Sequence, residues 1–415
     1  MRIIPVAVVT YVLAYVDRIN VAMVLPYVDR SFGLTNADVG FAAGIFFVGY
    51  MLLQIPAGML AYRWGARRVV AILMILWGLS AIATGLVETK NELFVARFVL
   101  GVFEGGVWPA VLVLLATWFA PAERARANAL WMICLPISAV IMAPITGWLL
   151  GILPWRWVFI AEGVPPLMWV VVWLVLIADR PRAAKWLAPE ERERLEERLA
   201  AGGPGKAMPR SFVTVWTDPR VLWLAAAYFF WMVGFYGYTM WVPSVVKGLA
   251  AGRNSSLVGW IVAVPFAFAI VAMVLNSVWS DRRLKRRAHV WGPLLVGVVG
   301  LAGGQWMARS PAQELGFLVL TAIGVYAPFG PFWAIPSALL PAEVLGAALG
   351  IINAIGNLGG FVGPYVVGYI RGQTHGSFAG LLALGASLLV TVVIVVRMDV
   401  DRRALPPEPR CGPQT

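Results

Sequence analysis

The chain has 415 residues, of which 60% are hydrophobic and 13% are charged. Soluble proteins carry about 25% charged residues, so this composition excludes an ordinary soluble domain. The net charge of +12 does not indicate a nucleic-acid-binding protein, because the basic residues cluster between apolar blocks. The two cysteines, Cys134 and Cys411, predict neither a disulfide framework nor a metal cluster, and we expect no cofactor.

Apolar blocks of about 20 residues, the length that crosses a bilayer core, recur along the whole chain. They predict an all-α polytopic membrane protein with twelve transmembrane helices and no cleavable signal peptide. The predicted helices cover residues 4–27, 37–60, 69–88, 92–116, 127–150, 158–178, 221–246, 257–279, 289–308, 314–339, 347–370 and 378–397. We divide them into two six-helix halves, 1–178 and 220–398, with a linker at 179–219 and a tail at 399–415.

The first block contains two adjacent charged residues within the sequence YVDRINV, residues 15–21. At the centre of a membrane helix, Asp17 and Arg18 each cost roughly 2.5–3.5 kcal/mol. Their side chains point about 100° apart on a helix, so they can serve different partners. Tyr15 and Asn20 lie at a similar depth on the same helix and are candidate substrate contacts. Charged residues so deep in a span mark ion or substrate pathways by default.

The fourth block adds a second pair of charged residues, Arg97 and Glu104. Seven residues separate them, so they share one helix face and lie about 10 Å apart along the axis. This face contains three residues without a side chain, Gly101, Gly105 and Gly106. Another helix or a ligand can therefore approach it closely. Two deep charges on each of two helices therefore define the candidate site.

Two interpretations of these four charges remain open. In the first, Asp17, Arg18, Arg97 and Glu104 neutralise one another and only hold helices together. Apolar residues would do this without the desolvation cost, so we favour the second, a functional site. Asp17 and Glu104 are then the candidate proton acceptors, because no histidine lies deep in a span. An anion that binds an arginine would release its carboxylate partner to take up a proton.

The remaining polar residues within spans are uncharged or peripheral. Glu162 lies near the outer end of the sixth block, where we expect a structural contact. The second half has no deep charge, but Tyr236 and Asn353 are candidate pocket residues. Trp333 follows the proline-rich sequence PFGPF, which is typical of a discontinuous helix at a binding site. Gln54 fits a pocket residue and an interhelical hydrogen bond equally well.

The linker and the loops predict orientation. Residues 189–201 begin with Pro189 and end before two glycines, which predicts a short surface helix followed by a flexible GGPGK segment. Lys and Arg are biased to one side of the predicted membrane, with 24 on the side of the termini and 7 on the other. The positive-inside rule then places both termini in the cytoplasm, in a bacterial-type inner membrane.

Two loops repeat a pattern 219 residues apart. GMLAYRWGARR (58–68) follows the second block, and SVWSDRRLKRR (277–287) follows the eighth. Both resemble the G-x-x-x-D-R-x-G-R-R loop of the major facilitator superfamily, in which the Asp helps to latch the two halves. We therefore assign gating roles to Arg67, Arg68, Asp281 and Arg282. Tyr62 replaces the Asp in the first copy, so the latch of that half is in question.

Seven segments together resemble the anion:cation symporter family of this superfamily, and the last three look most like its tartrate and phthalate permease branch. They are YVDRINVA, GYMLLQIPAG, ARFVLGVFEGGVWPA, WFAPAERARA, WRWVFIAEG, DRPRAAKWLAPEER and INAIGNLGGFVGP. The resemblance spans nearly the whole chain. It implies the major facilitator fold and proton-driven uptake of organic anions such as dicarboxylates, sugar acids or aromatic acids.

The resemblance also implies residue roles. In sugar-acid members, the counterpart of Arg18 binds the substrate carboxylate, those of Asp17 and Glu104 take up protons, and that of Arg97 pairs with a carboxylate. The counterparts of four further residues line the substrate site: Tyr15, Tyr50, Trp333 and Asn353. Leu135 stands where these members place a hydroxyl-binding glutamine, which favours a less hydroxylated substrate here.

We therefore expect a proton-coupled importer of a small organic anion that works by alternating access as a monomer in a lipid bilayer. Two alternatives remain. The protein could instead export a metabolite or drug in exchange for protons, or it could sense an anion without transporting it. A membrane enzyme is disfavoured because no nucleophile–base pair is evident.

Overall fold

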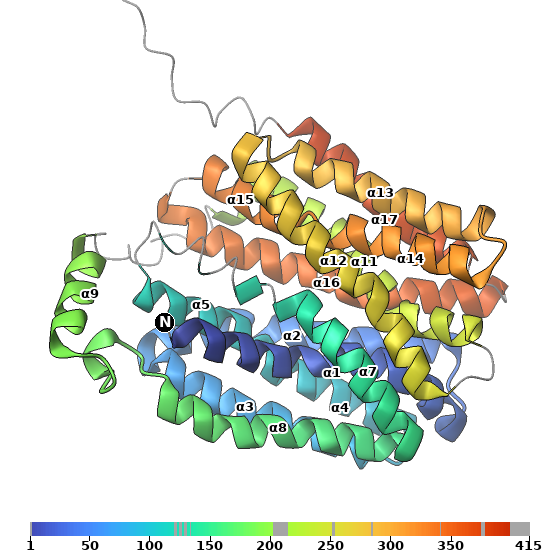
Figure 1. The fold of residues 1–415 in the computed structure, drawn as a ribbon, viewed down its shortest axis with the longest axis horizontal. Helices are drawn as coiled ribbons and strands as arrows, with labels where there is room; N and C mark the ends of the chain where they lie inside the picture. Colours follow the sequence, from blue (N-terminus) through green and yellow to red (C-terminus); the bar gives the residue numbers. More distant parts are fainter. Residues whose placement is uncertain are drawn as a thin grey trace, which may run out of the picture.

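The computed structural model describes residues 2–119, 123, 127, 131–132, 134–201, 215–250, 254–283, 285–340, 342–374 and 378–398. Regular structure in this part of the chain is entirely helical. Long helices lie side by side, and the N-terminus and the surface helix α9 (Pro189–Ala201) lie at the same end of the bundle (Figure 1). The predicted GGPGK segment and the predicted tail, 399–415, fall outside the described residues.

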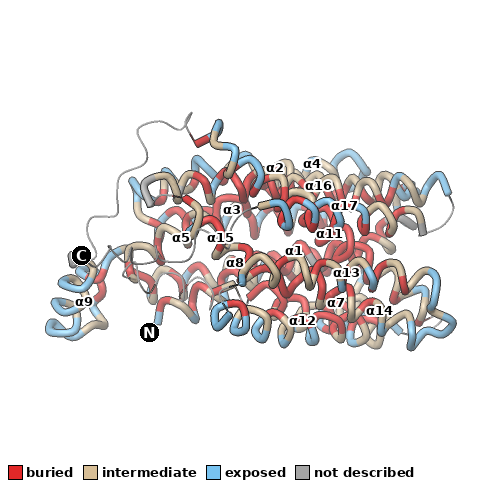
Figure 2. The backbone as a smooth tube through the Cα atoms, turned by 90° about the horizontal axis from the view of Figure 1, so that it is seen from above, coloured by how far each residue is buried: buried red, intermediate tan, exposed pale blue. Residues whose placement is uncertain are grey.

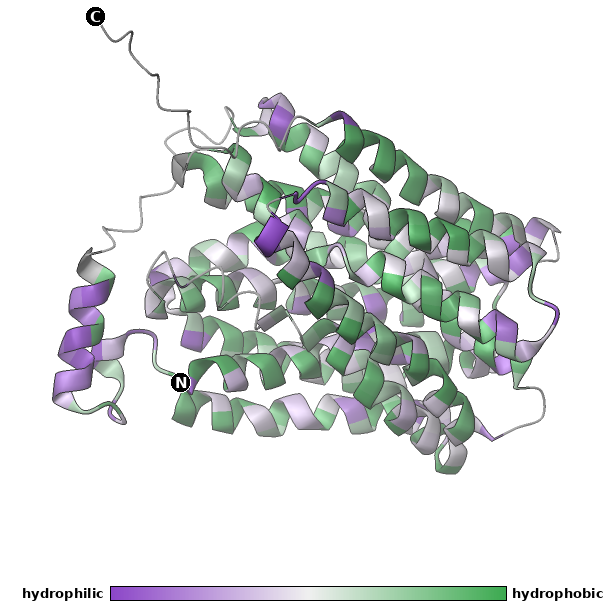
Figure 3. Ribbon diagram, turned by 45° about the horizontal axis from the view of Figure 1, so that its top comes forward, coloured by the Kyte–Doolittle hydropathy of each residue, from purple (hydrophilic) through white to green (hydrophobic). Residues whose placement is uncertain are grey.

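The N-terminal half, defined here as α1 to α8, contains the first six spans. Its helices are α1 (Ile3–Phe32), α2 (Asn36–Trp64), α3 (Ala66–Gly85), α4 (Lys90–Gly105), α5 (Val107–Trp118), α7 (Cys134–Ile152) and α8 (Trp155–Leu176). A 3₁₀ turn, η1 (Pro181–Ala183), and α9 follow. The predicted surface helix at 189–201 coincides with α9, which is largely hydrophilic (Figure 3).

The C-terminal half, defined here as α11 to α17, covers the other six predicted spans. Its helices are α11 (Pro219–Leu249), α12 (Ser255–Arg283), α13 (Ala288–Trp306), α14 (Pro311–Tyr326), α15 (Phe329–Leu339), α16 (Ala342–Thr374) and α17 (Phe378–Arg397). The predicted break before Trp333 is present, because α14 ends at Tyr326 and α15 starts at Phe329.

The predicted fold class is confirmed. Eleven spans in the described ranges are long and apolar enough to cross a membrane, with α4 and α5 forming one span and α14 and α15 another. The predicted span at 289–308 coincides with α13, a 19-residue helix that contains polar His289 and Gln305 and is not among these eleven. Buried residues follow the helix faces that point into the bundle (Figure 2).

Capping residues fix where several helices begin. Thr35 and Asp38 form a reciprocal capping box at the start of α2, and Thr89 caps α4 through the Glu92 N–H. Asp218 accepts from the Arg220 N–H at the start of α11, next to Pro219 in the first helical turn. These caps satisfy amide groups that helices leave without partners at their N-termini.

The two halves contact each other mainly through α2 with α16, α7 with α12 and α1 with α11. The closest approaches lie in the half of the bundle remote from α9 (Figure 1), where glycines meet main-chain atoms. A Cβ on Gly147 would come within 2.5 Å of the main-chain oxygen of Ser255, and one on Gly40 within 2.5 Å of the main-chain oxygen of Pro364. The Tyr27 and Ser255 hydroxyls add a 2.7 Å hydrogen bond. The halves are thus tightly joined at this remote end.

Candidate functional site

The centre of the site is a buried ion pair between α1 and α4. Arg18 Nε donates to Glu104 Oε2 at 3.1 Å, and the two side chains are 2% and 0% exposed. Arg18 Nη1 also donates to the Tyr11 hydroxyl at 3.5 Å. Arg18 Nη2 and Glu104 Oε1 have no hydrogen-bond partner among the described residues. The pair therefore keeps one free donor and one free acceptor.

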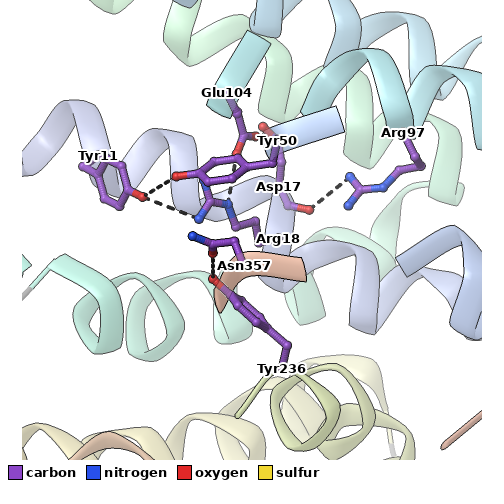
Figure 4. Close-up of polar contacts among 8 residues, drawn as sticks. All are labelled: Tyr11, Asp17, Arg18, Tyr50, Arg97, Glu104, Tyr236 and Asn357. Atoms are coloured by element: carbon purple, nitrogen blue, oxygen red, sulfur yellow. Dashed lines mark hydrogen bonds and ion pairs between the residues drawn. The ribbon is translucent and has the colours of Figure 1, made fainter. Parts of the chain in front are cut away.

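Aromatic rings surround the Arg18 guanidinium (Figure 4). It lies 4.4 Å from the centroid of the Tyr50 ring, 5.1 Å from that of Tyr15 and 5.3 Å from that of Phe46. The Tyr11 and Tyr50 hydroxyls lie 3.2 Å apart. Ring faces attract a desolvated cation without neutralising its charge. Arg18 thus remains able to bind a further anion.

The glycines predicted to thin α4 bring Glu104 to this position. A Cβ on Gly105 would lie 2.0 Å from the main-chain oxygen of Tyr50, and one on Gly101 would lie 2.0 Å from the main-chain oxygen of Phe46. Only glycine permits such a close approach of α4 to α2. Because α4 lies directly against the α2 backbone, Glu104 and Tyr50 meet the same arginine. The helix then breaks at Gly106, where α5 begins.

Arg97 and Asp17 form the second part of the cluster. Arg97 Nη1 donates to the main-chain oxygen of Asp17 at 3.4 Å, and its guanidinium lies 5.0 Å from the Phe46 ring. The resemblance implied a carboxylate partner for Arg97, but here its hydrogen bond reaches the main chain instead. Both Asp17 carboxylate oxygens are buried without a hydrogen-bond partner in the described residues.

The C-terminal half contributes uncharged polar groups. The Tyr236 hydroxyl donates to Asn357 Oδ1 at 3.4 Å, and Asn357 Nδ2 donates to Asn353 Oδ1 at 3.1 Å. Asn353 Nδ2 then donates to Gln54 Oε1 at 3.2 Å, across to α2. This chain of hydrogen bonds connects the two halves near Arg18 (Figure 4). Gln54 Nε2 has no partner among the described residues.

The other predicted site residues occupy different places. Trp333 packs edge-on against Tyr228 at 5.0 Å, and its Nε1 has no partner in the described part of the chain. Leu135 is buried in α7. Asn20 does not contact Arg18 through a hydrogen bond; it accepts one from the Thr146 hydroxyl instead. Asn20 therefore belongs to a separate polar contact in the N-terminal half.

The predicted gating residues lie at the end of the bundle that includes α9. Arg68, Asp281 and Arg282 are exposed. The Arg67 N–H donates to Asp179 Oδ1 at 2.7 Å, and a Cβ on Gly65 would come within 2.4 Å of the same carboxylate. Asp179, which follows α8, thus supplies a carboxylate to the loop in which Tyr62 replaces the expected Asp.

Sequence reasoning missed Tyr11 and Asp179. Tyr11 precedes Arg18 by seven residues, so helical spacing alone places both on one face and could have identified it. Asp179 contacts a residue 112 positions away, and no local pattern indicates this contact.

The fold and the buried ionic site are those of a polytopic membrane transporter. The sequence matches the family described as Major Facilitator Superfamily over residues 7–364 and again over 249–411. The chain belongs to this superfamily, as its motifs predicted, and is a transporter rather than an enzyme.

Individual relatives carry narrower names. The chain is 38% identical over 403 residues to a protein of Agrobacterium vitis named "Putative tartrate transporter", covering 95% of this chain and 92% of that protein. It is 28% identical over 366 residues to the "Quinolone resistance transporter" of Acinetobacter baumannii, covering 86% and 84%. The crystal structure of a D-xylose-proton symporter aligns with a TM-score of 0.78 at 15% identity, covering 97% and 98%. This last similarity shows the shared fold.

Proposed function

We propose that the protein imports a small organic anion together with protons by alternating access. The observation that carries this proposal is Arg18. It is a buried arginine with one free N–H group, surrounded by aromatic rings and paired with a carboxylate that can be neutralised by a proton. The 38% identity to a named tartrate transporter supports an organic acid as the substrate. Leu135 favours an acid with few hydroxyl groups.

In this mechanism, the substrate and Glu104 compete for Arg18. When Glu104 is ionised, it satisfies the guanidinium at 3.1 Å and disfavours a second carboxylate. A proton on Glu104 removes that competition, so the positive charge of Arg18 attracts the substrate. An arginine binds a carboxylate with two parallel hydrogen bonds, which lysine cannot reproduce. Proton binding and anion binding are thereby linked at one side chain.

Asp17 is the second proposed proton site, with Arg97 as its charge partner. Two carboxylates and two arginines balance when the carrier is empty and both acids are ionised. When both acids are protonated, the cluster holds two unbalanced positive charges. A dianion would then move with two protons without net charge, whereas a monoanion would carry positive charge inward. Tyr15, Tyr50, Tyr236, Trp333 and Asn353 are the proposed substrate contacts beside Arg18.

Alternating access requires the halves to separate at one end while they close at the other. We propose that the end containing α9 and both termini faces the cytoplasm of a bacterial inner membrane, as the Lys and Arg distribution indicates. Close glycine contacts at the remote end support a state closed to the outside. Arg67, Arg68, Asp281 and Arg282 are the proposed cytoplasmic gating residues. The protein would act as a monomer.

Proton-coupled efflux is the second candidate, because one relative is named for quinolone resistance. The experiment uses purified protein in liposomes with an imposed pH gradient and radiolabelled tartrate, succinate, phthalate or a fluoroquinolone. Import predicts that an organic acid accumulates on the alkaline side and that a protonophore abolishes this accumulation. Fluoroquinolone accumulation on the acidic side, with no response to any organic acid, would instead establish efflux. Binding of an acid without any flux would establish a sensor.

A further inference from the structure

Glu162 is a fifth buried charged side chain in the N-terminal half, and the proposed function does not use it. It lies on α8, seven residues after the helix begins at Trp155, and is 6% exposed. The sequence suggested a structural contact at the outer end of the span. The structure instead places Glu162 about two helical turns inside the bundle, on the side of the N-terminal half that contains Asn20.

One hydroxyl group connects Glu162 to α1. The Thr146 side chain on α7 donates to Asn20 Oδ1, and its Oγ1 lies 3.5 Å from Glu162 Oε1. Asn20 is three residues, or about one helical turn, from Asp17. Glu162 Oε2 and Asn20 Nδ2 are both buried without a hydrogen-bond partner among the described residues. The Thr146 hydroxyl therefore links α8 to α1 about one helical turn from Asp17.

Thr146 gives Glu162 little hydrogen bonding. A threonine hydroxyl has one proton. Thr146 Oγ1 is placed as donor to both Asn20 Oδ1 and Glu162 Oε1, the latter at 3.5 Å. One proton therefore serves two acceptors, and Glu162 receives at most a shared hydrogen bond. So little hydrogen bonding does not offset the cost of burying an ionised carboxylate, which favours the neutral acid.

The charged groups around Glu162 also favour its neutral form. Asp17 on α1 repels a charge on Glu162, whereas Arg97 on α4 attracts one but is hydrogen-bonded to the Asp17 main chain. No arginine or lysine within the described residues forms an ion pair with Glu162. An ionised Glu162 would thus be a third buried carboxylate against two buried arginines.

The other helices that pack on α8 add no cation at this depth. The described residues of α7 include no charged side chain. At this level α3 contributes Gly78, which packs against Gly163, and its only charged residues, Arg67 and Arg68, lie in its first turn. On α8 itself, Arg156 donates to the Val87 oxygen near the helix start. Burial without a cation favours the neutral acid.

We propose that Glu162 is a third proton site, which holds a proton while the remote end is closed. This inference rests on the proposed proton coupling. Glu162 lies between Asp17 and the helix end at Trp155, which is the outer end in the proposed orientation. A proton from outside would therefore load Glu162 before it reaches the Asp17 carboxylate. Glu162 is not one of the proposed substrate contacts, so it is a positioning residue that acts through its charge on Asp17.

The first test is infrared difference spectroscopy of the protein in lipid, titrated with pH. The wild type should retain a C=O stretch of a protonated carboxylic acid at a pH at which exposed glutamates are ionised. Glu162→Gln should lose this component, while Glu197→Gln, an exposed change on α9, should keep it. Thr146→Val retains Glu162 but removes its hydrogen-bond partner, so the component should shift in frequency. An unchanged band in Glu162→Gln, or an unshifted band in Thr146→Val, would overturn the assignment.

The second test is transport. In liposomes, Glu162→Gln should lose accumulation driven by a pH gradient, whereas Glu197→Gln should accumulate the acid like the wild type. Accumulation in Glu162→Gln equal to that of the wild type would overturn the role of Glu162 in proton coupling. If the wild type itself shows no gradient-driven accumulation, the proposed function fails instead. The infrared titration needs no substrate, so it still tests the proton on Glu162 in that case.

Discussion

The two halves of the molecule have similar helices but different polar chemistry. In the described residues, the buried charged side chains all belong to α1, α4 and α8: Asp17, Arg18, Arg97, Glu104 and Glu162. The buried polar groups of α16 are the amides of Asn353 and Asn357. This difference indicates a division of labour. In the proposed mechanism, the N-terminal half handles charge, and the C-terminal half offers neutral hydrogen bonds and aromatic surface to the substrate.

The same division explains how the halves could separate at low cost. Within the part of the chain that the structure describes, the hydrogen bonds between the halves, Tyr27 with Ser255 and Asn353 with Gln54, are neutral. A neutral hydrogen bond contributes about 0.5–1.5 kcal/mol net, because water replaces it when it opens. Breaking a buried ion pair by removing one partner would cost about 3–5 kcal/mol. With the ion pair Arg18–Glu104 confined to one half, rocking leaves it intact.

The largest expected effect comes from Arg18. Arg18→Lys keeps the charge but loses the two-pronged geometry, so affinity for the organic acid should fall about tenfold or more, which is roughly 1.4 kcal/mol. Isothermal titration or thermal shift of purified protein measures this. Arg309→Lys, an exposed arginine of the C-terminal half, is the matched control and should bind normally. Unchanged affinity for the organic acid in Arg18→Ala would show that Arg18 does not bind the substrate.

Locking the remote end should stop turnover almost completely. Tyr27 and Ser255 belong to different halves and their hydroxyls lie 2.7 Å apart. In a background without Cys411, a short bifunctional thiosulfonate reagent should bridge Tyr27→Cys and Ser255→Cys across the space left by the tyrosine ring and block transport. A reductant should restore transport, and each single cysteine variant should be insensitive to the reagent. Full activity of the crosslinked protein would show that the halves do not rock apart at this point.

A smaller, several-fold effect is expected at Gly147. A Cβ at this position would come within 2.5 Å of the main-chain oxygen of Ser255. Gly147→Val should therefore disfavour the state in which the remote end is closed. Ser255→Cys in this variant should then react faster with a membrane-impermeant thiol reagent added from outside, and transport should slow. Gly151→Val is the control, since no atom lies within 4 Å of a Cβ at that position. Equal labelling of the two variants would contradict the tight contact.

The smallest expected effect is at Asp218, a charged residue at the start of α11 that we expect to contribute to stability and not to transport. Asp218→Ala removes the cap of α11 and should lower the free energy of unfolding by about 1 kcal/mol without affecting transport at neutral pH. The Arg220 side chain donates to Asp218 and holds the pKa of its carboxyl below the usual value. This stabilisation is complete above the unfolded pKa of about 3.9 and disappears as the pH falls through the lower folded pKa. Thermal unfolding of wild type and variant should therefore converge in acid.

The sequence predicted the helices and the charged residues well, because both depend on the cost of polar groups in a bilayer. Apolar length located the spans, and Pro189 with the following glycines located α9. The partners of the charges could not be predicted. Arg18 pairs with Glu104, 86 residues away, rather than with neighbouring Asp17.

That choice of partner depends on how closely α4 approaches α2 at Gly101 and Gly105. Such an approach is a property of tertiary packing, which one sequence does not specify. The contact of Asp179 with Arg67 and the depth of Glu162 were missed for the same reason. Each depends on where α8 lies relative to α1 and α3.

The central claim is that Asp17 and Glu104 couple protons to anion transport. The most direct measurement is accumulation of a labelled organic acid in liposomes under a pH gradient, compared with exchange of labelled for unlabelled acid without a gradient. Asp17→Asn and Glu104→Gln should each abolish gradient-driven accumulation, while at least one of them still exchanges substrate at a measurable rate. If both variants concentrate the acid as the wild type does, the carboxylates are structural and the coupling site lies elsewhere.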